Sequence, residues 1–149
     1  MELTPREQVV IEALTWLRTP FHHQARLKEV GVDCVMLLAE VYERAGVLPH
    51  QEIGYYPPDW HLHRDAERYL MGLLEVAHEV TSPLPGDVAL FKFGRVFSHA
   101  GIVIEYPRII HAYWTQNEVV YADIGKQPLL DKQGKPREVK YMSPFKDKL

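Results

Sequence analysis

The sequence predicts an α+β layer fold, with helices in the first half packed on an antiparallel β-sheet in the second half. Residues 4–17 and 35–45 carry apolar side chains at helical spacing. Residues 88–122 instead consist of short apolar runs separated by turn residues, which is typical of a β-meander. The length of 149 residues suits one domain, so we expect residues 1–149 to share a single core.

The composition is that of an ordinary globular protein, and it argues against several classes of partner. The apolar share is 46%, the charged share 25%, and the net charge is −3. No basic face predicts a nucleic-acid partner, and no apolar run is long enough for a membrane span. The N-terminal residues lack the basic and apolar regions of a secretion signal. We therefore expect synthesis in the cytoplasm and, for work outside the cell, delivery without a signal peptide.

The first predicted helix begins with a strong start signal. Thr4 is a capping residue, Pro5 takes the first helical position, and Glu7 completes a capping box. Apolar residues at helical spacing continue to Leu17. The Thr19–Pro20 pair then ends the helix, because the residue before a proline avoids the α region.

A short polar stretch, Phe21-His22-His23-Gln24, precedes the only cysteine of the chain. Two adjacent histidines raise the question of a metal site. Adjacent side chains rarely converge on one ion, however, and no acidic residue is close in sequence. We expect a loop that lines a binding site, with a solvated loop as the alternative, and no metal.

The second predicted helix begins at that cysteine. Asp33 is a good capping residue, the helix runs over Val35–Ala45, and Gly46 takes the position after its end. Cys34 therefore falls in the first turn, where free N–H groups and the helix dipole favour a thiolate. A single cysteine forms neither an internal disulfide nor a thiolate zinc cage. A small buried apolar side chain remains the alternative role for Cys34.

A loop rich in proline and aromatic residues follows over residues 48–60. Its aromatic residues, among them Tyr56 and Trp60, either form one wall of a binding cleft or cover the core. A third helix is predicted over residues 61–77, with His61 and His63 on its surface.

Four strands are then predicted to form an antiparallel meander. Residues 123–136 are polar and rich in turn formers, and residues 138–142 predict an edge strand. The four strands of the meander are Val88–Phe91, Ser98–Ile104, Ile109–Trp114 and Val119–Ala122.

Two histidines fall within apolar strands of this meander. His99 and His111 are twelve positions apart across one tight hairpin, and adjacent strands lie about 4.8 Å apart. We expect the two rings to come within hydrogen-bonding reach, although each histidine alone is also compatible with an ordinary structural role. With Cys34 they supply a nucleophile, a base and a group that orients the base, and N–H groups at the helix start supply an oxyanion hole.

Four sequence motifs together resemble the NlpC-type cell-wall peptidases, which are papain-like cysteine hydrolases of bacterial peptidoglycan. The resemblance runs from about residue 16 to residue 111 or slightly beyond. Residues 19–25 and 56–60 look more like the branch found in tailed phages, prophages and gene-transfer particles, which often lacks a signal peptide. The four motifs are Gly-Val-Asp-Cys at 31–34, Pro-Gly-Asp-Val-Ala-Leu-Phe at 85–91, Ser-His-Ala-Gly-Ile at 98–102 and Ile-His-Ala at 110–112.

The resemblance implies a papain-like fold and cleavage of a stem-peptide amide, commonly the bond between D-glutamate and a diamino acid. It implies Cys34 as nucleophile, His99 as base and then acid, and His111 as the residue that orients His99, with no metal or cofactor. Stem peptides and phage-like tail proteins are the expected partners, and the expected location is a virion or tail acting on the cell wall. The expected substrate-binding residues are Phe21, His22, His23, Gln24, Asp33, Tyr56, Trp60 and Ser98.

The chain departs from the family pattern at two places. Val35 and Met36 stand where the family usually has serine and glycine, and Phe21 stands where many members have a tyrosine whose hydroxyl helps to shape the site. These departures favour the first alternative function, a non-catalytic tail-tip protein that keeps the fold. A second alternative is a related thiol amidase or acyltransferase with another acyl substrate.

Overall fold

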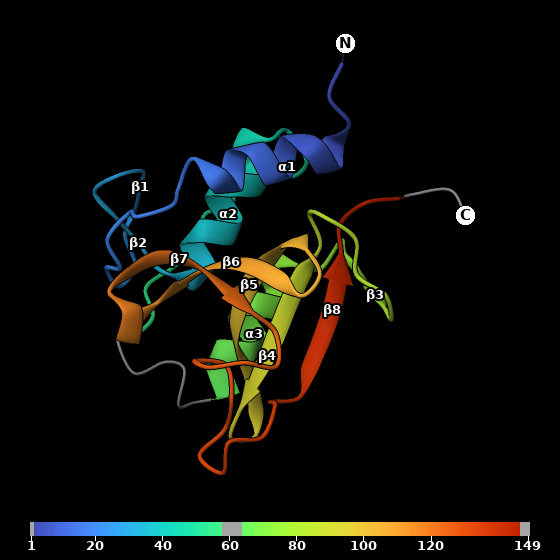
Figure 1. Ribbon diagram of the computed structural model, residues 1–149. Helices are drawn as coiled ribbons and strands as arrows, with labels where there is room; N and C mark the ends of the chain where they lie inside the picture. The colour runs from blue at the N-terminus through green and yellow to red at the C-terminus, as the bar shows by residue number, and fades with distance from the viewer. Residues whose placement is uncertain (1, 58–63, 147–149) are drawn as a thin grey trace.

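The computed structural model describes residues 2–57 and 64–146, and it has the predicted α+β architecture (Figure 1). Three helices pack against one face of a six-stranded antiparallel sheet, and apolar residues of all three helices share one core with that face. No helix in the described part of the chain is long and apolar enough to cross a membrane.

Helix α1 spans Pro5–Leu14 and begins with the predicted capping box. The Thr4 hydroxyl accepts a hydrogen bond from the Glu7 N–H at 3.1 Å, and the Glu7 carboxylate accepts one from the Thr4 N–H at 2.9 Å. The helix ends earlier than the predicted residue 17, because the next residues form tighter turns. The Thr15 hydroxyl bonds back to the Glu12 carbonyl, and Trp16 turns inward and is fully buried.

Helix α2 spans Cys34–Arg44 and is the central helix of the fold (Figure 1). As predicted, Asp33 caps it, with its carboxylate oxygen Oδ1 accepting the Met36 N–H at 3.0 Å. Gly46 follows the helix with a φ of 76°, a conformation that favours glycine. Residues 34–42 are all buried, so this helix supplies most of the helical side of the core.

The sheet contains the predicted meander, but its edge differs from the prediction. The strand order is β3-β8-β4-β5-β6-β7, so β8 is an interior strand and its predicted edge position is wrong. Helix α3, Arg64–Leu73, ends earlier than the predicted residue 77. The chain after it forms β3, which pairs with β8 and takes the edge of the sheet. The strands are β3 His78–Val80, β4 Val88–Phe93, β5 Val96–Glu105, β6 Arg108–Tyr113, β7 Glu118–Asp123 and β8 Val139–Ser143.

Two small elements add to the predicted set. Strands β1, Arg26–Leu27, and β2, Gly31–Val32, form a short hairpin directly before the cysteine helix. A 3₁₀ turn, Trp114–Gln116, follows β6, so that strand ends one residue before the predicted Trp114. The far face of the sheet carries a second, smaller core, to which Leu129 of the segment after β7 contributes.

One arginine ties α1 to the sheet. The Arg6 guanidinium donates to the Asp87 carboxylate at 2.9 Å, to the Pro85 carbonyl at 3.0 Å and to the Ser143 hydroxyl at 3.3 Å. It also lies over the Phe145 ring, 4.4 Å from the ring centre. The first helix, the start of β4 and the end of β8 therefore meet at a single side chain.

Replacing Arg6 by alanine is expected to destabilise the fold by about 2–3 kcal/mol, because Asp87 is 1% exposed and loses its cationic partner. Urea unfolding measures this loss. Arg95→Ala, at an exposed turn, is the matched control and should cost less than about 0.5 kcal/mol. Equal midpoints for Arg6→Ala and the unmodified chain would contradict this role.

Candidate active site

Cys34 lies at the first residue of α2, where the helix packs against β5. Cys34 is 6% exposed, and the backbone N–H of Ala100 on β5 lies close enough to lower the pKa of its thiol. The N–H groups of Cys34 and Val35 also lie close enough to stabilise a thiolate. The only cysteine of the chain therefore sits beside the residue that follows His99.

The two strand histidines are in contact, as predicted. His99 Nε2 lies 2.8 Å from His111 Nδ1, and both side chains are buried. The backbone pairing of β5 with β6 runs from the hairpin to the Ile102–Ile110 pair, so the histidines lie just beyond it. The missing side chain of Gly101 makes room, since a Cβ there would lie 2.7 Å from Ile109 Cδ1 and 3.2 Å from the His111 Cβ.

Burial keeps His111 neutral at physiological pH. It lowers the pKa of this ring to about 4, so only one of its two nitrogens carries a proton at pH 7. His111 Nε2 has no hydrogen-bond partner among the described residues. In one of the two possible arrangements, His99 Nε2–H donates to His111 Nδ1 and His99 Nδ1 carries no proton. Only that arrangement prepares His99 to receive a proton from a thiol.

Aromatic rings surround the histidine pair. Tyr113 stacks on His111 at an interplanar angle of 20°, and its ring centre is 4.8 Å from that of His99. Phe91 and Phe93 each lie 5.9 Å from His99. The sequence motifs did not point to these rings. The two-residue alternation in 91–93 and 111–113 was the available signal, because it places them on the sheet face that carries the histidines.

The state of the Cys34 thiol differs from the prediction. Burial raises its pKa, the neighbouring Asp33 carboxylate raises it further, and the N–H groups around the sulfur offset this only in part. The expectation of a readily formed thiolate is therefore wrong for the free protein. Because desolvation outweighs the helix terminus, a base must remove the proton as the sulfur attacks.

Asp33 connects the helix to two loops of the site. Beyond its capping bond, its oxygen Oδ2 accepts the Gln24 N–H at 2.7 Å and the Tyr56 hydroxyl at 2.5 Å. His23 Nδ1 lies 3.9 Å from the same oxygen, and His23 Nε2 lies 2.7 Å from the Tyr56 carbonyl oxygen. Four of the expected binding residues therefore meet, although the Asp33 carboxylate is buried and occupied by donors of the chain itself.

The other expected binding residues lie around this cluster. Phe21 is half-buried, and its N–H bonds to the Asn117 carbonyl at 2.8 Å, whereas His22 is exposed. Ser98 is buried, and its hydroxyl has no partner among the described residues. Trp60 lies outside the described residues. Substrate contact by any of these side chains stays a prediction. In the part of the chain described here, no group of three or more His, Cys, Asp or Glu side chains could hold a metal ion.

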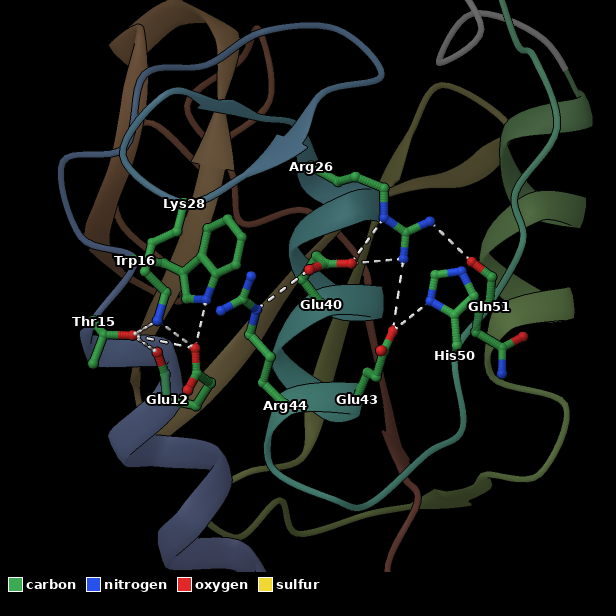
Figure 2. Close-up of polar contacts among 10 residues, drawn as sticks. All are labelled: Glu12, Thr15, Trp16, Arg26, Lys28, Glu40, Glu43, Arg44, His50 and Gln51. Carbon is green, nitrogen blue, oxygen red and sulfur yellow. Dashed lines mark hydrogen bonds and ion pairs between the residues drawn. The ribbon is translucent and has the colours of Figure 1, made fainter.

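A network of ion pairs and hydrogen bonds links the loops around the site to helix α2 (Figure 2). The Arg26 guanidinium pairs with the Glu40 carboxylate of α2 at 2.7 Å and donates to the Gln51 carbonyl at 2.9 Å. His50 lies 2.7 Å from the Glu43 carboxylate, also on α2. The hairpin before Cys34 and the loop that carries Tyr56 are thus both fastened to α2, the helix that begins at Cys34.

A family model for the NlpC/P60 family matches residues 18–137. The chain belongs to the NlpC/P60 family. The match contains Cys34, His99 and His111, so all three lie within the NlpC/P60 domain. No curated protein sequence matches the chain at a significant level.

Solved structures share the fold at low sequence identity. NlpC2 from Trichomonas vaginalis is 16% identical with a TM-score of 0.66, and the match covers 96% of this chain and 49% of that one. The peptidoglycan hydrolase RipB from Mycobacterium tuberculosis is 13% identical with a TM-score of 0.65, covering 96% of this chain and 66% of that one. The chain thus spans about half the length of NlpC2. The NlpC/p60 domain of the peptidoglycan hydrolase SagA is 16% identical with a TM-score of 0.60, covering 93% of this chain and 97% of that domain.

The lowered pKa of His111 predicts that stability falls as the pH is lowered from about 6.5 to about 4, because only the unfolded chain gains this proton in that window. The loss amounts to about 3 kcal/mol. Urea unfolding at several pH values measures it, and His111→Gln should flatten this part of the slope. His50→Gln, at an exposed histidine, should leave the fall in place. If the free energy of unfolding falls equally steeply between pH 6.5 and 4 in the His111 variant and in the unmodified chain, the lowered pKa does not belong to His111.

The raised pKa of Cys34 predicts slow alkylation by iodoacetamide in the native chain. The rate should lie at least about tenfold below that of the same chain in urea at pH 8 and still rise above pH 9, because little thiolate forms below that pH. Mass spectrometry follows the modification of the single cysteine. A native rate that levels off below pH 8 would mean that the thiolate is already formed.

Proposed function

We propose that this chain is a cysteine endopeptidase that hydrolyses a stem-peptide amide of peptidoglycan, the bond between D-glutamate and a diamino acid. The observation that carries the proposal is the 2.8 Å contact of the buried His99 and His111 rings, next to Ala100, whose N–H acts on the thiol of Cys34 at the N-terminus of α2. Membership of the NlpC/P60 family and the fold shared with two structures named as peptidoglycan hydrolases support it.

In the proposed mechanism the Cys34 sulfur attacks the carbonyl carbon of the amide while His99 Nδ1 accepts the thiol proton. His111 accepts the His99 Nε2–H through its Nδ1 and stabilises the imidazolium that forms. The tetrahedral oxyanion takes hydrogen bonds from N–H groups at the start of α2. His99 then protonates the leaving amine, and a water molecule, deprotonated by His99, hydrolyses the thioester.

The two departures from the family pattern do not obstruct this chemistry. Val35 and Met36 are 0% and 2% exposed and pack into the core, so their bulk is taken up away from solvent. Phe21 cannot donate a hydrogen bond, but the Tyr56 hydroxyl on the Asp33 carboxylate provides a polar group within electrostatic range of Cys34. The tyrosine of many family members therefore has a candidate replacement from another loop.

We further propose that the enzyme is carried on a phage-like tail and opens the cell wall during DNA entry. The resemblance of residues 19–25 and 56–60 to the phage and gene-transfer branch supports this setting. An amidase that cuts between sugar and peptide is the second candidate. It is favoured by the shared fold of an N-acetylmuramoyl-L-alanine amidase from Bacteroides uniformis, 12% identical with a TM-score of 0.57, covering 93% of this chain and 97% of that one.

Mass spectrometry of peptidoglycan fragments tests the proposal and separates the two bonds. The unmodified chain should release fragments that Cys34→Ala does not release, and their masses identify the bond that was cut. Fragments broken between muramic acid and L-alanine would favour the amidase. Identical fragments from both proteins would show that Cys34 is not the nucleophile, and none from either folded protein would favour the non-catalytic role.

Histidine variants should divide by their roles. His99→Ala is expected to lower kcat/KM by at least about a thousandfold, nearly as much as Cys34→Ala, because the members of a catalytic unit act together. His111→Asn should cost less, since it keeps a hydrogen-bond acceptor. His78→Ala, at an exposed histidine of β3, is the matched control. Full activity in His99→Ala would refute the assignment of the base.

A further inference from the structure

A half-buried arginine lies against the aromatic rings beside His99. The Arg137 guanidinium carbon is 3.7 Å from the centre of the Phe93 ring, and that ring is 5.9 Å from His99 and 6.3 Å from Trp114. Trp114 is 38% exposed, so this group of rings reaches the surface. The positive charge of Arg137 also acts on the Tyr113 hydroxyl. A cation therefore lies one ring away from the proposed catalytic base.

The backbone holds this arginine in place. Arg137 lies two residues before β8, and the carbonyl of the intervening Glu138 accepts the Lys92 N–H at 3.0 Å. Its own Nη1 donates to the Lys92 carbonyl at 3.3 Å. The Glu138 carboxylate, the nearest acid in sequence, lies 3.8 Å from the Lys92 ammonium group. The position of Arg137 is thus fixed by β4 and by the Phe93 ring.

The guanidinium has no anionic partner in the described part of the chain. Its Nε is buried without a hydrogen bond, and no described carboxylate pairs with it. Among the described residues, four other arginines pair with carboxylates. These are Arg6, Arg26, Arg44 and Arg108.

The chemistry of this position suits a carboxylate ligand. A guanidinium stacked on an aromatic ring still donates hydrogen bonds in its own plane. Apart from the Nη1 bond to the Lys92 carbonyl, the guanidinium of Arg137 makes no hydrogen bond to a described residue, which leaves its Nη2 to donate to a carboxylate oxygen. The distances above put the guanidinium at most about 10 Å from the His99 ring centre, which an extended peptide spans in about three residues. A D-glutamate linked through one carboxyl group keeps the other free, and a diamino dicarboxylic acid also carries a free carboxylate.

We propose that Arg137, supported by Phe93 and Trp114, binds a free carboxylate of the stem peptide within about three residues of the scissile amide. The inference rests on the proposed function for the identity of the peptide. It makes Arg137 a specificity-determining residue, so the protein should discriminate between stem peptides with free and with amidated carboxylates.

Binding to the Cys34→Ala chain tests this without turnover. The probes are the tripeptide L-alanyl-γ-D-glutamyl-diaminopimelate and its two carboxamide analogues, one amidated on the glutamate and one on the diamino acid. Calorimetry measures the Kd of each. Arg137→Gln should raise the Kd of the free-acid tripeptide by about tenfold or more. Amidating the recognised carboxylate should raise it similarly, and the two changes together should add nothing further.

Two further variants keep the result interpretable. Arg108→Gln is the matched control, because Arg108 also lies over an aromatic ring, 5.2 Å from the Tyr121 ring centre, but at the opposite end of β6. It should leave every Kd unchanged. Arg137→Lys keeps the charge without the planar fork and should give an intermediate Kd, which separates lost recognition from lost folding.

The outcomes separate this inference from the proposed function. Equal Kd values for the free-acid and amidated peptides, additive effects of the two changes, or no binding at all would overturn the carboxylate subsite. Arg137-dependent binding without cleavage by the unmodified chain would overturn the endopeptidase and leave the subsite standing. Cleavage of peptidoglycan without any dependence of peptide binding on Arg137 would overturn the subsite and leave the endopeptidase standing.

Discussion

The buried carboxylate of Asp33 fixes the geometry on which the rest of the site depends. One oxygen caps the cysteine helix through the Met36 N–H, and the other holds the Gln24 N–H and the Tyr56 hydroxyl. The loop before the cysteine, the loop after its helix and the helix itself are therefore joined one residue before Cys34. Burial raises the pKa of this carboxyl, and its hydrogen bonds act in the opposite direction. The same burial gives these hydrogen bonds their strength.

The buried surroundings of Cys34 and His111 favour the uncharged form of both side chains in the free protein. Burial raises the pKa of the Cys34 thiol and lowers that of His111, so both resist ionisation. A neutral thiol and a neutral His111 are consistent with proton transfer during attack, in which the charge forms only as the sulfur bonds to carbon. The rings of Phe91, Phe93 and Tyr113 contribute to this environment by packing around His99.

The sequence predicted the parts of the site that depend on local chemistry. The capping box of α1, the Asp33 cap of α2 and the hairpin that pairs His99 with His111 follow from residues close to one another along the chain. The order of β3 and β8 could not be predicted in this way, because it is set by pairing between segments more than 60 residues apart.

Contacts between distant segments also escaped the sequence. The second role of Asp33 as acceptor for Tyr56, the Arg26–Glu40 ion pair and the position of Arg137 over Phe93 each join residues from separate elements. The thiol prediction failed for a related reason. The favourable effect of a helix terminus is visible in sequence, whereas the burial that outweighs it depends on the whole fold.

The tautomers of the two histidines provide the most direct test of the account. Long-range ¹H–¹⁵N NMR of the imidazoles at pH 8, with Cys34→Ala and with His99→Gln and His111→Gln for assignment, reads the protonation of each ring nitrogen. We predict a neutral His99 protonated at Nε2 and a neutral His111 protonated at Nε2, so that His99 Nδ1 carries no proton and can accept that of the thiol. A His99 protonated at Nδ1, or a charged His111, would contradict it.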